Sequence, residues 1–186
     1  QTSRGKSGTV TQTATRERGS MHRETTRTGD KDYTATRTVD RTRHRETGTG
    51  TFQRTTTGAN GRTRQVDGTV TKTGVGAAGT DGTYTRANGN SGTFHADTRG
   101  TENGRATEGT ITNQNGASAT FTRDVERDEN SKTATASITG PNGRTASAET
   151  NTTRSEGETT RTRTVTGPEG NERTRSVTVT SEAGAN

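Results

Sequence analysis

The chain has 186 residues and a formal net charge of +6 at pH 7, and only 18% of its residues are hydrophobic. It contains no Cys and no Trp, which excludes a disulfide scaffold and argues against an ordinary globular core. No apolar stretch approaches the roughly 20 residues that a membrane-spanning helix needs. Composition alone would place the chain among disordered proteins, so a fold can be predicted only from periodicity.

A turn-like segment recurs along the whole chain. In chain order the segments are 5–8, 29–32, 58–61, 86–89, 113–116, 140–143 and 167–170. Glycine supplies the positive φ that such tight turns need, and we expect it at Gly61, Gly89, Gly116 and Gly143. Gly170 ends the corresponding turn of the last unit. The spacing predicts one repeat array with units near 5–28, 29–57, 58–85, 86–112, 113–139 and 140–166, and a partial unit at 167–186.

A second set of turns falls near the middle of the later units, at 100–104, 128–131 and 155–158. Each unit is therefore predicted to contain a strand, a turn, a second strand and a second turn. Thr is the commonest residue, and its β-branched side chain disfavours helix and suits a pleated strand. Segments such as 9–15 and 176–180 alternate strictly. The sequence thus predicts an all-β protein.

The scarce large apolar residues fall into two columns when the turns are aligned. One column contains Val66, Phe94, Phe121 and Ala148, and the other contains Tyr84, Ile111, Ile138 and Val165. Each member of the second column lies between two Thr or Ser residues, which a period of two places on the opposite face. We expect both columns to form a thin core, with Ile111, Ile138 and Val165 in one buried stack.

Two architectures fit these repeats. The strands could wind as a β-solenoid with two strands per coil, or form a long antiparallel β-ribbon of hairpins. Two apolar columns per unit favour the two-walled solenoid, because its walls face each other. Sheets that pair across several chains would bury the same columns.

The sequence points away from catalysis. Residues 74–79 match the glycine pattern of a dinucleotide-binding loop, but no helix is expected after them. The three histidines, His22, His44 and His95, have unrelated positions in the repeat, and acidic pairs near turns, such as Asp128 with Glu129, suit turn capping better than Ca²⁺ binding. We expect no enzyme activity, cofactor or metal site.

The positive charge comes mostly from Arg, which alternates with Thr and Glu along the strands. We interpret this pattern as a solvated face of mixed sign that opposes lateral association. Nucleic acid is disfavoured as a partner, because aromatic stacking platforms are scarce and acidic residues are interspersed throughout. An acidic polysaccharide is the alternative anionic partner.

The strand–turn–strand–turn units resemble those of curli-type and related functional-amyloid fibre subunits of bacterial biofilms. The resemblance implies a stacked β-solenoid and an extracellular or cell-surface location. The Thr-x-Thr tripeptides, for example at 110–112 and 164–166, also resemble the ice-binding face of antifreeze proteins, where threonine hydroxyls organise water. A surface adhesin is a further alternative.

The ends of the array show no amphipathic cap, and uncapped β-repeats expose unpaired edges that other chains can join. We therefore expect a structural subunit that polymerises head to tail with copies of itself. The expected joining element is the strand 173–181, with Arg173, Val177, Val179 and Ser181 at the assembly edge.

Overall fold

A computed structural model describes residues 8–29 and 33–180 of the chain. Within these ranges the protein is all-β. Its strands are β1 (Gly8–Glu17), β2 (Ser20–Gly29), β3 (Tyr33–His44), β4 (Thr49–Thr57), β5 (Thr63–Gly74), β6 (Ala77–Thr85), β7 (Ser91–Thr101), β8 (Gly104–Asn113), β9 (Ser118–Arg127), β10 (Ser131–Thr139), β11 (Thr145–Ser155), β12 (Glu158–Thr166) and β13 (Glu172–Thr180).

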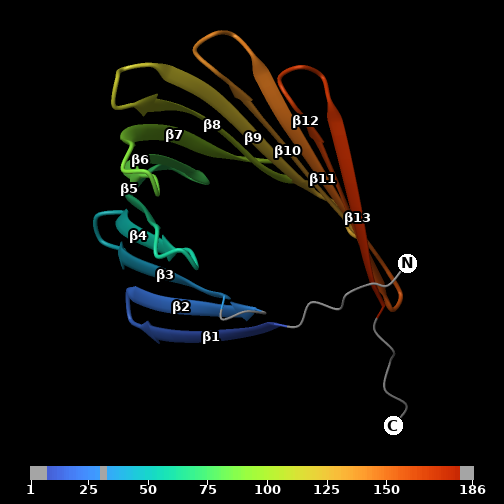
Figure 1. Ribbon diagram of the computed structural model, residues 1–186, viewed down its shortest axis with the longest axis horizontal. Coiled ribbons are helices and arrows are strands. Elements are labelled where there is room, and N and C mark those ends of the chain that lie inside the picture. The colour runs from blue at the N-terminus through green and yellow to red at the C-terminus, as the bar shows by residue number, and fades with distance from the viewer. Residues whose placement is uncertain (1–7, 30–32, 181–186) are drawn as a thin grey trace. The chain divides into compact units, whose positions relative to one another are not determined.

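The thirteen strands form one antiparallel sheet in which each strand lies beside its neighbours in sequence, without any crossover (Figure 1). Among the described residues, β1 pairs only with β2 and β13 only with β12, so the sheet is open. This confirms the all-β class and the long antiparallel ribbon. The preference for a two-walled solenoid was wrong, because a solenoid strand would pair with the next coil and not with the strand that directly follows it.

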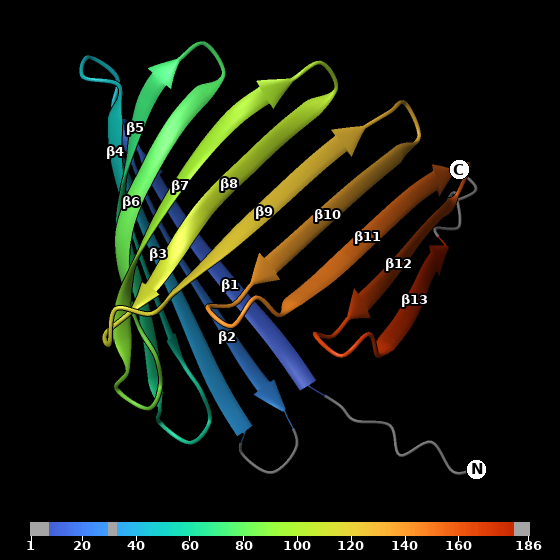
Figure 2. The same ribbon diagram turned by 90° about the horizontal axis from the view of Figure 1, so that it is seen from above.

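Short hairpin turns explain why the ribbon forms. In the turn at 58–61, the Gly58 N–H donates to the Arg62 carbonyl at 2.9 Å, and the Gly61 N–H donates to the Gly58 carbonyl at 2.9 Å. Gly61 has φ +71°, as expected for a β-turn followed by a left-handed residue. The turns that end in Gly89, Gly116, Gly143 and Gly170 repeat both bonds and the positive φ. Such turns return the chain to the adjacent position in the sheet, as the hairpins in Figure 2 show.

The expected units each contain two strands. Residues 113–139 hold β9 and β10, and residues 140–166 hold β11 and β12. The partial unit at 167–186 contributes β13 alone. The expected turns at 5–8 and 29–32 lie mostly outside the described residues.

The contacts divide the chain into two units, which are described separately below. The first comprises residues up to 73 together with 79–95, and the second comprises 74–78 together with residues from 96 onward. Strands β1–β4 lie in the first unit and β8–β13 in the second.

The hydrophobic core is very small. In the described part of the chain only Val39, Ala96 and Val125 are buried hydrophobic residues, with exposed fractions of 3%, 8% and 3%. Several other hydrophobic residues are largely exposed, such as Val10 at 66% and Val179 at 62%. Most side chains of the described strands are therefore half-buried or exposed.

Candidate functional site: the two faces and open edges of the sheet

The pairing register assigns each strand residue to a face. Successive residues of a strand point to opposite faces, and residues paired across strands point to the same face. In each unit we name one side the arginine face and the other the threonine face, after the residues that dominate them.

In the first unit, strands β1–β5 separate their side chains by chemistry. The arginine face carries Arg16, Arg23, Arg27, Arg37, Arg41, Arg43, Arg54 and Arg64, together with Val10, Ala14, Met21, Tyr33, Ala35, Val39, Phe52, Val66 and Val70. The threonine face carries almost all of the Thr residues of these strands and the acidic residues Glu17, Glu24, Asp40 and Asp67.

In the second unit, strands β8–β13 show the same separation. The arginine face carries Arg105, Arg123, Arg127, Lys132, Arg154, Arg161, Arg163, Arg173 and Arg175, with Ile111, Ala119, Phe121, Val125, Ala134, Ala136, Ile138, Ala146, Ala148, Val165, Val177 and Val179. The threonine face carries Glu108, Asp124, Glu126, Glu149, Glu158 and Glu172 among its Thr and Ser residues.

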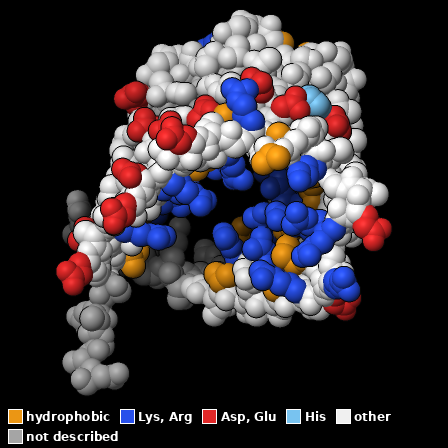
Figure 3. Space-filling view, turned by 180° about the vertical axis from the view of Figure 1, so that it is seen from behind, with side chains coloured by type: hydrophobic (Ala, Val, Ile, Leu, Met, Phe, Trp, Pro, Cys, Tyr) orange, Lys and Arg blue, Asp and Glu red, His pale blue; other side chains and the backbone are white. Residues whose placement is uncertain are grey.

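Basic and acidic residues are therefore not mixed within these strand pairs. Figure 3 shows most Lys and Arg side chains gathered with hydrophobic ones, and most Asp and Glu side chains on other parts of the surface. The expectation of a face of mixed sign was wrong, because Arg and Glu that alternate along a strand point to opposite sides. In β7, Arg99 lies 3.6 Å from Glu108 of the threonine face, which shows that the separation is less strict there.

Arginine side chains surround the most buried hydrophobic side chain of the first unit. Val39 pairs with Arg23 on β2 and with Arg54 on β4, and its same-face neighbours along β3 are Arg37 and Arg41. The aliphatic stems of arginine can cover apolar surface while the guanidinium groups stay in water. This arrangement explains how Val39 is 3% exposed in a single-layered sheet.

The second unit repeats this arrangement around Val125, which is also 3% exposed. Val125 pairs with Arg105 on β8 and with Ala134 on β10, and its same-face neighbours along β9 are Arg123 and Arg127. Each unit thus has a valine enclosed by arginines as its most buried side chain.

The close packing of arginines affects their electrostatics. The pKa of Arg37 is lowered by its burial and then by the positive charges of Arg54, Arg23, Arg27 and Arg41. Arginine stays protonated at physiological pH despite such a shift. The cluster around Val39 is consequently a concentrated positive field.

Each phenylalanine of the chain lies against a glycine. Phe52 pairs directly with Gly68, and Phe121 pairs directly with Gly109. A Cβ added at Gly68 would lie 2.7 Å from the Phe52 ring, and one added at Gly82 would lie 2.5 Å from the Phe94 ring. The rings of Phe52 and Phe94 are 6.4 Å apart in a tilted arrangement. Glycines thus make room for aromatic rings that lie over the sheet.

A shallow groove of about 780 Å³ also lies in the first unit. Its lining includes Met21, Arg41 and Phe52 together with the acidic residues Asp40 and Asp67. The groove is therefore lined by residues of both charge signs.

Hydroxyl groups pair across strands on the threonine face. Between β12 and β13, Thr160 with Thr178, Thr162 with Ser176, and Thr164 with Thr174 lie 3.0 Å apart. Similar pairs join Thr42 to Thr51 at 2.6 Å, Thr122 to Ser137 at 2.9 Å, and Thr139 to Thr145 at 2.8 Å. These ladders satisfy the side-chain oxygens within the sheet and reinforce the register.

Two of the histidines form hydrogen-bond contacts with aspartates. His22 Nδ1 lies 2.6 Å from Asp40, and His95 Nδ1 lies 2.7 Å from Asp81. All four side chains are about half exposed or more. In the part of the chain that the structure describes, no group of three His, Asp or Glu residues could hold a metal ion.

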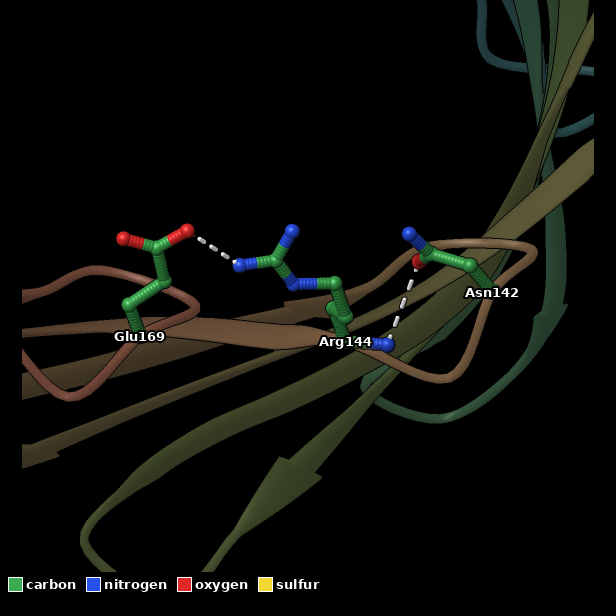
Figure 4. A network of polar contacts seen from close by, with 3 residues as sticks. All are labelled: Asn142, Arg144 and Glu169. Atoms are coloured by element: carbon green, nitrogen blue, oxygen red, sulfur yellow. Dashed lines mark hydrogen bonds and ion pairs between the residues drawn. The ribbon is translucent and has the colours of Figure 1, made fainter.

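Polar contacts also join neighbouring turns at one end of the strands. The Arg144 N–H donates to Asn142 Oδ1 at 3.2 Å, and Arg144 Nη2 donates to Glu169 Oε1 at 2.6 Å (Figure 4). Asp128 accepts the Glu129 N–H at 2.9 Å, as expected for turn capping. Exposed contacts of this kind contribute about 0–1 kcal/mol each.

The two predicted apolar columns lie in alternate strands of the same sheet, and not on facing walls. Val66, Phe94, Phe121 and Ala148 belong to β5, β7, β9 and β11, and Tyr84, Ile111, Ile138 and Val165 belong to β6, β8, β10 and β12. The first column is half-buried, as are Tyr84 and Ile111. Ile138 and Val165 are 41% and 36% exposed, so the expected buried stack of these residues with Ile111 is not formed.

The expected assembly edge lies on the last strand of the sheet. Arg173, Val177 and Val179 occupy the arginine face of β13, and the two valines are 45% and 62% exposed. Ser181 lies outside the described residues. At the opposite edge, Val10 of β1 is 66% exposed.

Sequence comparison with family models and curated proteins, and structural comparison with solved proteins, found no match. No helix among the described residues is long and apolar enough to cross a membrane. The resemblance to curli-type subunits consequently extends to strand–turn repetition alone, since the sheet is an open ribbon.

Proposed function

We propose that this chain is a structural subunit of an extracellular or cell-surface filament, and that copies join head to tail through β13 and β1. The observation that carries the proposal is the pair of open edges, each of which leaves a row of backbone N–H and C=O groups without a strand partner among the described residues. An unpaired β-edge gains main-chain hydrogen bonds when another chain supplies a strand.

The two edges match in their facial chemistry. On β13 the arginine face carries Arg173, Arg175, Val177 and Val179, and on β1 it carries Val10, Gln12, Ala14 and Arg16. Both strands present Thr or Ser on the threonine face. An added copy would therefore continue both faces across the junction.

The strand directions fix how this junction pairs. β1 and β13 run in the same direction, because each strand of the meander is antiparallel to its neighbours and both are odd-numbered. A copy that continues both faces therefore adds its β1 parallel to β13. We propose the register that places Val177 opposite Val10, because both valines are exposed. Val179 then lies opposite Gln12 and Arg175 opposite Gly8, so that these pairs contain no like charges.

Disulfide trapping tests this junction. Chains that carry Val10→Cys are mixed with chains that carry Val177→Cys and are oxidised with glutathione disulfide. We expect a product of twice the chain mass on non-reducing electrophoresis. The matched control replaces Val177→Cys by Thr178→Cys, whose side chain points to the opposite face, and it should give little product.

Microscopy tests the filament itself. We expect filaments from the full chain under negative stain, and none from a chain that lacks residues 171–186. Filaments that form normally without this segment would refute the junction. Discrete monomers from the full chain, with equal trapping by both cysteine pairs, would refute the function.

One observation favours ice binding as a second candidate. Thr160, Thr162 and Thr164 form hydroxyl rows with β13, and the neighbouring Arg161 and Arg163 point to the opposite face. The charges that adjoin these threonines in sequence therefore do not interrupt the rows. Inhibition of ice recrystallisation by the full chain, and its loss in Thr162→Lys, would support this candidate, and inactivity of the full chain would exclude it.

A further inference from the structure

The arginine face lacks internal charge compensation. In β1–β5 and in β8–β13 it carries Arg or Lys on every strand, and the acidic residues of these strand pairs point to the other side. The ion pairs found at Arg99 and Arg144 involve residues outside this face. Such a surface attracts anions and favours their close approach.

The spacing of the positive charges indicates a ligand with many anionic groups. Neighbouring strands lie about 4.8 Å apart, and same-face residues of one strand about 6.8 Å apart. Around Val39 these spacings place Arg23 and Arg54 on the neighbouring strands and Arg37 and Arg41 along β3, so that adjacent arginine positions are diagonal neighbours about 8 Å apart. A small anion would contact one or two of them, whereas a polymer with an acidic group on each unit would engage the whole row.

The type of side chain narrows the chemistry further. Arginine presents a planar fork that binds carboxylate, sulfate or phosphate through two parallel hydrogen bonds. Between the arginines lie exposed aliphatic side chains, such as Val10, Ile138 and Val177, with exposed fractions of 66%, 41% and 45%. A sugar ring offers apolar C–H groups beside its acidic substituents and so complements both kinds of residue.

Nucleic acid fits this face less well. Single-strand binding relies on open aromatic platforms for the bases. Here Tyr33 is the one aromatic of strands β1–β5 that is exposed on this face, at 51%. Phe52 and Phe94 are half-buried, and their rings lie over Gly68 and Gly82 and against each other. The face therefore offers many cations and few surfaces on which bases can stack.

We propose that the arginine face binds an acidic polysaccharide, and that the arginines around Val39 form a principal contact site. The carboxylates of the polymer pair with the guanidinium groups of Arg23, Arg37, Arg41 and Arg54, and its sugar rings lie on exposed apolar side chains elsewhere on the face, such as Val10. This binding does not depend on filament formation, because the face is separate from the edge hydrogen bonds of β1 and β13.

Binding of the full chain to immobilised polygalacturonate, measured at several salt concentrations, tests the proposal. We expect affinity that falls as salt rises, and no binding to neutral dextran. The double variant Arg23→Gln/Arg54→Gln should bind at least about tenfold more weakly and show a shallower salt dependence. The matched control Arg62→Gln/Arg144→Gln removes the same charge from turns and should bind almost as well as the parent chain.

A second variant separates loss of binding from loss of folding. It is needed because Arg23 and Arg54 flank the buried Val39, so that their replacement could also destabilise the fold. Arg161→Gln/Arg163→Gln removes two arginines of the same face on β12, where no residue between β11 and β13 is buried. It should also weaken binding, with unchanged circular dichroism. Equal losses in the turn control would show attraction by net charge alone and would overturn the proposal.

Two further results would assign the face to another partner and overturn the proposal. The first is tighter binding to single-stranded oligothymidylate than to polygalacturonate, lost in both face variants. The second is unchanged polysaccharide binding in both face variants, with loss of lateral self-association in sedimentation, which would indicate that a second copy of the chain covers the face.

Discussion

At the scale of single residues, Val125 and Val165 form a matched pair for locating the core. Both lie on the arginine face of the second unit, but Val125 is 3% exposed and Val165 is 36% exposed. Threonine has nearly the shape of valine, so replacement mainly tests the burial of a hydroxyl. We expect Val125→Thr to lower the free energy of unfolding by about 1–3 kcal/mol and Val165→Thr by less than about 0.5 kcal/mol.

Urea unfolding followed by circular dichroism measures both changes. Equal effects of the two substitutions would contradict the assignment of Val125 as the core of its unit. Ile138, which was expected in the buried stack, is 41% exposed, so a polar replacement there should likewise have a small effect.

Gly68 tests the contacts between glycine and phenylalanine. A Cβ at this position would lie 2.7 Å from the Phe52 ring and 2.8 Å from the Asp81 carbonyl oxygen. We expect Gly68→Ala to destabilise the protein by about 1–3 kcal/mol through overpacking. Gly74→Ala on the same strand is the control, because its Cβ would meet only Ala77 at 3.7 Å. Thermal unfolding of the two variants should differ clearly, and similar midpoints would contradict the close packing at Gly68.

At the scale of the hairpin, Gly143 tests whether backbone conformation holds the turn. Its φ is +75°, and an added Cβ would meet nothing within 4 Å. Any loss of stability must therefore come from the backbone. We expect Gly143→Val to cost about 1–2 kcal/mol or more, and Gly143→Asn to cost less because asparagine tolerates this region. Chemical unfolding gives the comparison, and equal costs for the two replacements would argue against the turn geometry.

The turns and the strands were predictable from sequence because both depend on local chemistry. Asn142 and Gly143 form a turn through their own backbone preferences, and alternating Thr in 176–180 favours a strand wherever it lies. The pairing of the strands was harder to predict from the sequence. The same strand–turn units fit a ribbon or a solenoid until the hydrogen-bond partners of each strand are known. The short turn at 140–144, closed by the Gly140 N–H on the Arg144 carbonyl at 2.9 Å, decides for the ribbon.

The separation into two faces could have been predicted in part from the sequence, by assigning alternate residues of each strand to opposite faces of the sheet. Arg161 and Arg163 flank Thr162, and a period of two already places them on the opposite side from the threonine. What the sequence alone could not supply was the register that aligns Arg161 with Val177 and Arg163 with Arg175. Along the chain itself, acidic and basic residues alternate, and only the register separates them into two faces.

At the scale of the whole molecule, the open sheet predicts a gradient of protection from hydrogen exchange. Strands in the middle of the sheet are paired on both sides, whereas β1 and β13 are paired on one side within the described residues. We expect the amides of β13 that point away from β12 to exchange fastest in the isolated chain, and local opening at the edges to dominate.

Assembly should change this gradient in a specific way. If copies join through β13 and β1, both edge strands should become protected in filaments while β9 and β10 stay as they were. Exchange measured by mass spectrometry before and after assembly gives the comparison. Edge strands that remain unprotected in filaments would indicate lateral stacking of sheets in place of edge joining.

The way in which each hairpin turn keeps side chains on their face also limits how the gene for this protein can change. Each hairpin returns the chain to the sheet with the same side chains on the same side, so a duplicated or deleted hairpin leaves every later residue on its original face. Loss of one codon within β10 would instead move Ile138 to the side of the hydroxyl rows. Recombination between repeats can therefore lengthen or shorten this protein in steps of one hairpin, whereas small insertions within strands would be eliminated by selection.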